Sequence, residues 1–570
     1  MDRDPPSSQR IENGLQNRLA RLNARWRVFT RRNQDETTTR YMQERERYQA
    51  EARALQLAIS RAAANTTNLQ SQHQPPPAAQ NSNPHRKFTE RWSFIGKMVS
   101  CTHCKATMWL GEKIRSSSIS QPRFTLCCQN GQVILSSLPP APPPLDTLLN
   151  DPNFSRHIRA YNSMLSFTSM GGTIDYAVMD GHGPYSFRIS GQNYHHIGSL
   201  LPTQGRKPRF AQLYIYDTDD EVRNRCRALN SQQSVNGVDL TILEALQRML
   251  DSINPYVRVF RNARDVLHAN NIVDLRIRII QARPGRQYTR PTADEVAALT
   301  VGGEHTDGET RDIIVCKIDG NLQRIYETHP SYMPLQYPLL FPYGTDGWSE
   351  HIPCVEGSSS NRRYVTMREF CAFLIQYRVN DWNILLRSGR LFLQFIVDCY
   401  AAIEAWRLNY IRSHQGTLRA DLYSGLQDAI TAGENDPTAV GKRLILPATF
   451  TGGPRYMRQH FLDAMAICCQ LGYPDFFMTF TCNPNWPEIM EALSHQLGQS
   501  ASDRPDIVAR VFRLKLKERT RDFKEKKLFG KVIADMFLLQ LCVYSLCTYI
   551  ALFILSLKFV ISPIHRYTCY

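Results

Sequence analysis

The stretch that most constrains the fold is FFMTFTCNPNWPEI, residues 476–489. Its first six residues, 476–481, are aromatic, β-branched or apolar, which predicts a buried β-strand. Two asparagines and two prolines follow within six residues, so the strand ends in a rigid polar turn. Such a turn presents side chains at a site, and Asn483 is the candidate. It either orients a phosphate or a metal-bound water, or forms an Asx-type turn ahead of Pro484.

The length and charge of the chain limit the classes of protein it can be. Its 570 residues predict several domains, and 42% hydrophobic with 21% charged residues allow most of them to fold around cores. The net charge of +16 favours a polyanionic partner, either nucleic acid or an anionic membrane surface. The first residues form no apolar signal segment, so we expect paired cysteines to be metal ligands or buried thiols rather than disulfides.

Composition divides the chain into seven consecutive segments, and we expect an α+β multidomain protein. The segments are a basic helical or partly disordered arm (1–64), a Pro/Gln/Asn linker (65–86), a Cys-rich zinc-binding-like module (87–137), a mixed α+β region (138–328), a Pro/aromatic connection (329–365), amphipathic helices around the opening strand (366–535), and an apolar divergent tail (536–570).

Local periodicity predicts the elements within these segments. Pro334, Pro338 and Pro342 recur every four residues, which predicts an extended connection rather than a helix or a central strand. Its aromatic side chains pack in a core or stack on unpaired bases. Alternation or helical spacing predicts strands at 186–192, 211–218, 276–283 and 312–318, and helices at 238–252, 459–471, 504–531 and, as a long pair, 366–412.

The tail contains 22 consecutive uncharged residues, 536–557. As a helix, this segment is long enough to span a bilayer. Two other readings are a buried helix of a soluble domain and the translation of an intron or a frameshifted segment. We expect an apolar C-terminal helix, with a membrane as the partner in one alternative.

Four cysteines, Cys101, Cys104, Cys127 and Cys128, have the pattern of a structural zinc site. A Cys-x-x-Cys turn supplies two thiolates, and the adjacent pair supplies two more if the backbone bends between them. His103 is the alternative ligand in place of one thiol. Buried thiols beside an exposed turn are the competing interpretation.

A dense run of basic residues is the candidate nucleic-acid surface. Apolar residues are interleaved with the basic ones, so one helix face can pack while the other meets phosphate. A solvated helix face is the alternative. The basic residues are Arg510, Arg513, Lys515, Lys517, Arg519, Arg521, Lys524, Lys526 and Lys527.

Several segments, in order over more than 400 residues, resemble the protein of plant-type Helitron transposons, which joins a replication-initiator nuclease for rolling-circle replication to a helicase. They are CTHCKATMWLGE with CCQNGQV, GPYSFRISGQNYHHIGSLLP, FAQLYIYDT, HPSYMPLQYPLLFPYG, LPATFTGGPRYM, and FFMTFTCNPNWPEI followed by LFGKVIAD. Residues 366–535 are similar to the Helitron helicase-like N-terminal domain. The resemblance implies that they form an incomplete antiparallel-sheet nuclease domain.

The resemblance also implies catalytic parts that this sequence lacks. In the family, a His-x-His pair holds a divalent metal, a tyrosine of a pair attacks the phosphate, and a helicase with a phosphate-binding loop follows. Here His195 and His196 are adjacent and far upstream, Tyr567 and Tyr570 lie in the divergent tail, and no phosphate-binding loop motif occurs.

The sequence therefore predicts a Helitron-type protein truncated before the His-x-His motif. We expect it to bind single-stranded or transposon-end DNA in the nucleus without nuclease or helicase activity, and no small-molecule substrate is evident. The alternative is a zinc-stabilised nucleic-acid-binding protein tethered to a membrane by residues 536–557. A third reading is a chain that is not stably made, because strand 476–481 lacks a partner strand.

Overall fold

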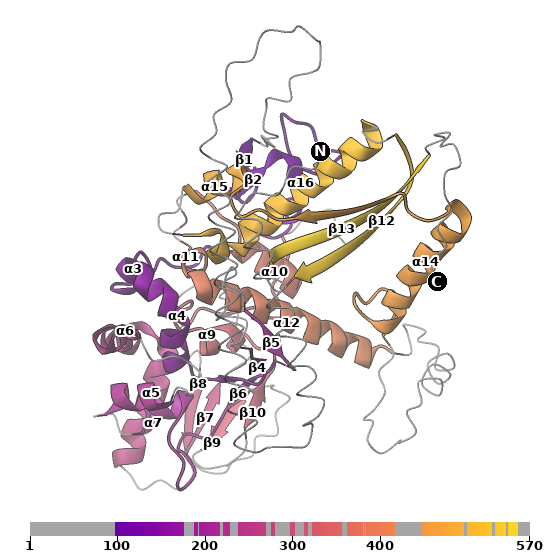
Figure 1. The fold of residues 1–570 in the computed structure, drawn as a ribbon. Helices are drawn as coiled ribbons and strands as arrows, with labels where there is room; N and C mark the ends of the chain where they lie inside the picture. Colours follow the sequence, from indigo (N-terminus) through magenta and orange to yellow (C-terminus); the bar gives the residue numbers. More distant parts are fainter. Residues whose placement is uncertain are drawn as a thin grey trace, which may run out of the picture. The chain divides into compact units, whose positions relative to one another are not determined.

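The structure is a computed structural model (Figure 1), and it separates into the units Met1–Arg91 and Trp92–Tyr570. The predicted arm and linker lie outside the described residues. The structure describes residues 97–175, 187–191, 193–216, 220–228, 237–269, 275–279, 297–301, 313–316, 322–355, 362–379, 381, 383–415, 446–494, 499–526, 530–542 and 545–556.

A small hairpin opens the second unit. Strands β1 (Met98–Ser100) and β2 (Thr107–Trp109) pair antiparallel, and the 3₁₀ turn η1 (Leu110–Glu112) follows directly. The carboxylate of Glu112 accepts a hydrogen bond from the backbone N–H of Trp109 at 2.9 Å, which fixes the start of the turn. The Cys-x-x-Cys turn is the connection of this hairpin.

Two of the helices described in the mixed region begin with an aspartate cap. Asp151 accepts from the N–H of Asn153, and Asp239 accepts from the N–H of Thr241, so each caps its helix. The helix predicted at 238–252 is confirmed. The helices are α3 (Leu145–Leu148), α4 (Pro152–Leu165), α5 (Glu221–Ala228), α6 (Leu240–Ile253) and α7 (Pro255–Ala269).

The strands of this region form small antiparallel sheets. Strand orders are β10-β6-β3, β4-β5 and β8-β7-β9. The predicted strands within 186–192, 276–283 and 312–318 are confirmed as β5, β7 and β9. The bounds are β3 (Ser169–Met170), β4 (Thr173–Ile174), β5 (Ile189–Ser190), β6 (His195–Ile197), β7 (Leu275–Ile279), β8 (Ala297–Val301), β9 (Ile313–Cys316) and β10 (Gln323–Ile325).

The prediction of a strand at 211–218 was wrong. Its first residues form the 3₁₀ helix η3 (Phe210–Tyr214). Leu213, Tyr214 and Ile215 are all buried, and three consecutive buried side chains do not fit the two-residue period of a strand. The side chain of Gln212 further holds the turn by accepting from the N–H of Arg209 at 3.1 Å.

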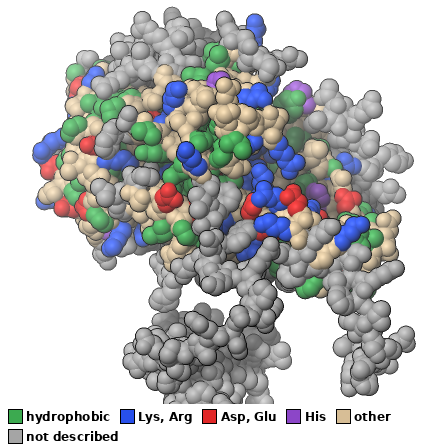
Figure 2. Space-filling view, turned by 90° about the horizontal axis from the view of Figure 1, so that it is seen from above, with side chains coloured by type: hydrophobic (Ala, Val, Ile, Leu, Met, Phe, Trp, Pro, Cys, Tyr) green, Lys and Arg blue, Asp and Glu red, His purple; other side chains and the backbone are tan. Residues whose placement is uncertain are grey.

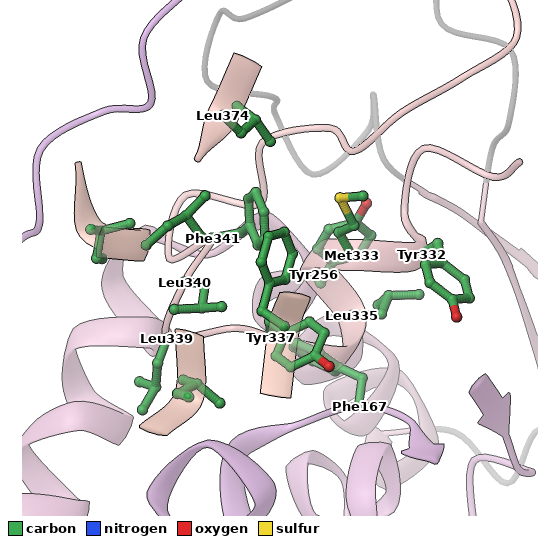
Figure 3. Close-up of a cluster of buried hydrophobic side chains, with 14 of the residues drawn as sticks. Phe167, Tyr256, Tyr332, Met333, Leu335, Tyr337, Leu339, Leu340, Phe341 and Leu374 are labelled. Atoms are coloured by element: carbon green, nitrogen blue, oxygen red, sulfur yellow. The ribbon is translucent and has the colours of Figure 1, made fainter. Parts of the chain in front are cut away.

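The Pro/aromatic connection is part of the core, as Figure 3 shows. Residues 327–345 are all buried. An extended backbone was predicted, but residues 332–336 form the short helix α9 (Tyr332–Gln336). Pro334 is its third residue, where the missing N–H would have no partner within the helix, so proline is tolerated there.

The following helices complete the same core. They are α10 (Met367–Leu374), α11 (Ile384–Arg387) and α12 (Gly389–Ser413). Two long helices were predicted at 366–412, but among the described residues only α12 is long, and α10 and α11 have 8 and 4 residues. One continuous hydrophobic core runs from Cys101 in the hairpin to Ala402 in α12. The N-terminal hairpin, the mixed region and these helices therefore share one interior.

A buried polar network joins three of these elements. The carboxylate of Asp398 in α12 accepts hydrogen bonds from Asn193 at 2.7 Å, Tyr332 at 3.2 Å and Tyr337 at 2.8 Å. It also lies 2.8 Å from Nε2 of His195 in β6. Burial, and then the charge of Asp398, raises the pKa of both tyrosines well above the usual range, so each remains an O–H donor.

The last part of the chain forms a second core. Phe480 of β11 and Phe512 of α16 stack at 5.4 Å between ring centroids, and Trp109 of the hairpin belongs to the same cluster. The strand predicted at 476–481 and the helix predicted at 459–471 are present. Of the helical segment predicted at 504–531, residues 505–525 are helical, and residue 531 already belongs to a strand. The elements are α14 (Pro454–Leu471), β11 (Phe476–Thr481), α15 (Pro487–Ser494), η4 (Ala501–Asp503) and α16 (Pro505–Glu525).

The predicted apolar C-terminal helix was wrong. Residues 531–556 form the strands β12 (Lys531–Cys542) and β13 (Ser545–Ser556), and the sheet order is β11-β13-β12, all antiparallel. An uncharged run satisfies its backbone equally well by pairing with β11, which otherwise has an open edge. In the part of the chain that is described, no helix has the length and apolar character needed to cross a membrane.

Candidate metal centre and basic groove

The thiols of Cys101, Cys104, Cys127 and Cys128 are buried together, and all four sulfur atoms lie within 4.8 Å of one another. The Sγ of Cys128 is 3.7 Å from the Sγ of Cys101 and 3.7 Å from that of Cys127. Tetrahedral coordination with Zn–S bonds of about 2.3 Å requires sulfur–sulfur separations of about 3.8 Å. The geometry therefore fits a metal ion held by four thiolates.

Two turns position the thiols. The N–H of Cys101 donates to the carbonyl of Ala106 at 2.8 Å and closes the first turn. In the second turn the N–H of Gly131 donates to the Sγ of Cys128 at 3.3 Å. Gly131 has a φ of +89°, and a Cβ there would lie 2.7 Å from the ring of His103, so glycine is required. The backbone does bend so that both adjacent cysteines face one point.

Contacts among the four thiols lower the pKa of some of them and raise the pKa of the others. Hydrogen bonds from Cys104, Cys127 and Cys128 lower the pKa of the Cys101 thiol, while the contacts with Cys101 and Cys104 raise the pKa of Cys127. Cys101 opposes ionisation of Cys104, but hydrogen bonds from Cys127 and Cys128 outweigh it and lower the pKa of Cys104 to about 6. The two thiols of the Cys-x-x-Cys turn therefore ionise readily, whereas the adjacent pair, whose pKa values are raised, resists ionisation. A cation at the centre removes that resistance, because it stabilises every thiolate at once.

His103 was the alternative ligand. It is exposed, and the four-sulfur group is complete without it. Among the described residues no other cluster of His, Cys, Asp or Glu has the arrangement of a metal site.

The turn after β11 holds the candidate Asn483. Its side-chain oxygen accepts a hydrogen bond from the N–H of Asn485 at 2.9 Å, and its carbonyl accepts from the N–H of Trp486 at 3.2 Å. Asn483 itself is exposed. The side chain is thus engaged in an Asx-type turn that leads into α15.

Helix α16 carries the predicted basic run, and two of its basic residues are engaged in the interior. Lys515 is buried and its Nζ lies 2.7 Å from the carboxylate of Glu488. Arg510 makes a bidentate pair with Glu112, at 2.8 and 2.7 Å, and lies over the ring of Trp109 at 4.5 Å. These two side chains fix α16 to its neighbours.

The other predicted cations have different surroundings. Arg513 and Lys517 are exposed, and within the described parts of the chain they make no ion pair. Arg521 pairs with Glu518, and Lys526 pairs with Asp522 at 2.7 Å. Lys524 lies 2.8 Å from Asp535, Arg519 has other contacts, and Lys527 lies outside the described residues.

Residues 370–539 match the family model of the Helitron helicase-like domain at N-terminus. This match supports the identification of a Helitron-like protein over that part of the chain. The match begins in α10 and ends in β12, so it contains the α12 helix of the first core as well as α16 and β11. A comparison with curated proteins finds no match.

The hairpin that carries the metal centre is attached to the Helitron helicase-like domain at two places. Arg378 donates to the carbonyl of Cys104 at 3.0 Å, and the N–H of Thr107 donates to the carbonyl of Tyr377 at 2.8 Å. The pair between Arg510 and Glu112 forms the other attachment. The cysteine module is therefore joined to the domain by side-chain and backbone bonds.

A groove of about 1240 Å³ lies between the cysteine module and α16. The sequence reasoning found its α16 side but missed Lys113 and Arg115 on the other side, because no local pattern marks them. On the face drawn in Figure 2, Lys and Arg side chains lie among hydrophobic ones. The basic residues that line the groove are Lys113, Arg115, Arg510, Arg513, Lys517, Arg521 and Lys524.

Proposed function

We propose that these 570 residues form a Helitron-type DNA-binding protein that holds a structural Zn²⁺ and does not itself nick DNA. The proposal that the protein binds DNA rests on the exposed side of α16. Arg513 and Lys517 project from it without an acidic partner among the described residues, while Lys515 on the same helix is paired in the interior. Surface cations that have no acidic partner and lie beside a groove attract a polyanion.

Binding to a single-stranded oligonucleotide, followed by fluorescence anisotropy over a range of salt, tests this part. Each phosphate contact contributes about 0.7 to the slope of log affinity against log salt for a single strand. Arg513→Ala with Lys517→Ala should lower the slope by about 1.4. The matched control is Arg223→Ala with Arg248→Ala, two exposed arginines on α5 and α6. Equal slopes for both double variants would contradict the proposal.

Zn²⁺ is the proposed ion because four soft thiolate ligands in a closed tetrahedral group suit it, and no open position remains for chemistry. Elemental analysis of the purified chain should give one zinc per molecule, and Cys127→Ser should lower that content. Stoichiometric iron, or no bound metal at all, would refute a structural zinc site.

The absence of nicking is proposed because the chain has no His-x-His pair, and because the Asn483 side chain accepts a bond within its own turn. Incubation of the chain with end-labelled single-stranded DNA and Mn²⁺ should yield neither a cut strand nor a covalent protein–DNA product. Robust cleavage with covalent linkage would overturn this part.

A nuclear location is proposed from the resemblance to Helitron proteins. A fluorescently tagged chain should co-localise with chromatin, and its recovery in the membrane fraction would favour the tethered alternative.

A further inference from the structure

The two walls of the groove have different origins. One wall consists of residues from 110–126, and the other is the side of α16 within residues 509–525. The first wall lies between Cys104 and Cys127, so it belongs to the loop that the four-thiol centre closes. The groove is thus built from the metal-closed loop on one side and the Helitron helicase-like domain on the other.

Direct contacts hold the two walls together at one end. Besides its pair with Glu112, Arg510 donates to the carbonyl of Thr107 at 3.2 Å, and the Nζ of Lys517 lies 3.4 Å from the carbonyl of Gly111. Trp109, directly before this wall, is 4% exposed and belongs to the second core with Phe512. A displacement of the loop would therefore change the groove.

The lining is cationic with an apolar component. Seven of its residues are basic and three are acidic, and each acid is already engaged, Glu112 by Arg510 and both Glu518 and Glu525 by Arg521. Excess positive charge therefore remains on both walls. The apolar lining residues include Leu110, Ile114, Leu126, Leu514 and Leu516.

Cations on both walls, together with an apolar lining, favour one class of ligand. A flexible polynucleotide strand can place successive phosphates against cations on two facing walls and its bases against the apolar lining, whereas a duplex presents one rigid convex surface. The lining contains no aromatic residue, so phosphate contacts rather than base stacking supply most of the affinity.

We infer that a single polynucleotide strand binds in this groove, with Lys113 and Arg115 as contacts, and that metal at the four-thiol centre strengthens this binding. The inference rests on the proposed DNA binding and adds the site and its regulation. Metal closes the loop that carries one wall, so metal and strand stabilise the same arrangement. Their effects are reciprocal, since each raises the affinity for the other by the same factor, about 5–150-fold for typical couplings.

The first test uses the zinc-loaded chain and needs no removal of metal. Lys113→Ala and Arg115→Ala should each weaken binding of a short oligothymidylate and flatten its salt dependence, without changing zinc content. Arg123→Ala is the matched control, because this exposed arginine belongs to the same loop but does not line the groove. Equal effects of all three variants, or tighter binding of duplex than of strand, would overturn the inference.

The second test measures the coupling. Zinc affinity is determined by competition with a chromophoric chelator, with and without the oligothymidylate, and should be higher with it. Glu112→Gln loosens the bond between the walls, so the coupling factor should fall towards one. A zinc affinity that oligothymidylate leaves unchanged, in a chain that binds the strand, refutes the inference but not the proposed function. A zinc-loaded chain that binds no DNA refutes both.

Discussion

Replacement of Asp398 by alanine should destabilise the second unit strongly, because one carboxylate satisfies three buried side chains and a partly buried one. Asn193, Tyr332 and Tyr337 donate to it, and His195 lies 2.8 Å from it with 0% of its side chain exposed. Removing one member of a buried, hydrogen-bonded pair costs about 3–5 kcal/mol, since the remaining groups stay buried without partners. Tyr337→Phe removes one of the donors and should cost about 1.5–3 kcal/mol.

Urea unfolding followed by near-ultraviolet circular dichroism measures the loss. With a slope of about 3 kcal/mol/M, a loss of 3–5 kcal/mol lowers the urea midpoint by about 1–1.7 M. Asp463→Ala on the exposed side of α14 is the control, and its effect should stay within about 0.5 kcal/mol. The reasoning fails if Asp398→Ala shifts the midpoint no more than Asp463→Ala does, or if Tyr337→Phe costs more than Asp398→Ala.

Three further predictions concern other parts of the molecule. Burial opposes ionisation of Glu369, but hydrogen bonds from Thr366 and Arg362 outweigh it and hold its pKa below the ordinary 4.5. The ionised carboxylate therefore contributes its full stabilisation above pH 4.5, and this stabilisation is lost as pH falls through the lowered pKa. Glu369→Gln should differ from the parent in thermal midpoint at pH 7 and converge with it in acid. Lys515→Met should cost about 3–5 kcal/mol in urea unfolding by leaving Glu488 buried and unpaired, and adding Glu488→Leu should recover part of the loss; a strictly additive double variant would exclude coupling. Hydrogen exchange should show protected amides in β11, and a chain ending at Asp535 should lose that protection, whereas unchanged protection would argue against pairing with β13.

The elements that sequence reasoning predicted are those with a local signature. Strand 476–481 is aromatic and β-branched and is followed directly by an Asn/Pro turn, and the cysteine spacing favours a four-thiol site, with His103 as the alternative ligand that the structure makes unnecessary. The tail has no such signature, because 22 uncharged residues suit a helix or a strand equally; the open edge of β11 decides between them. Lys113 and Arg115 could not be found either, because they face α16 across some 400 residues of sequence.

The burial of Lys515 shows a related limit. The basic run is regular in sequence, but the helical period turns Lys515 towards Glu488 and Arg513 towards solvent. The composition of a run therefore predicts that some of its cations are available, while the fold determines which ones are.

The central position of β13 has a consequence for how the protein is made. β11 is complete at residue 481, but the strand that pairs with it ends at residue 556, about 75 residues later. At about 5–20 residues per second, a ribosome needs roughly 4–15 s to synthesise that interval. During this time β11 has no partner from its own sheet, and its aromatic residues are available to chaperones or to other nascent chains. The rate of translation through residues 482–556 thus sets how long each new molecule is open to aggregation.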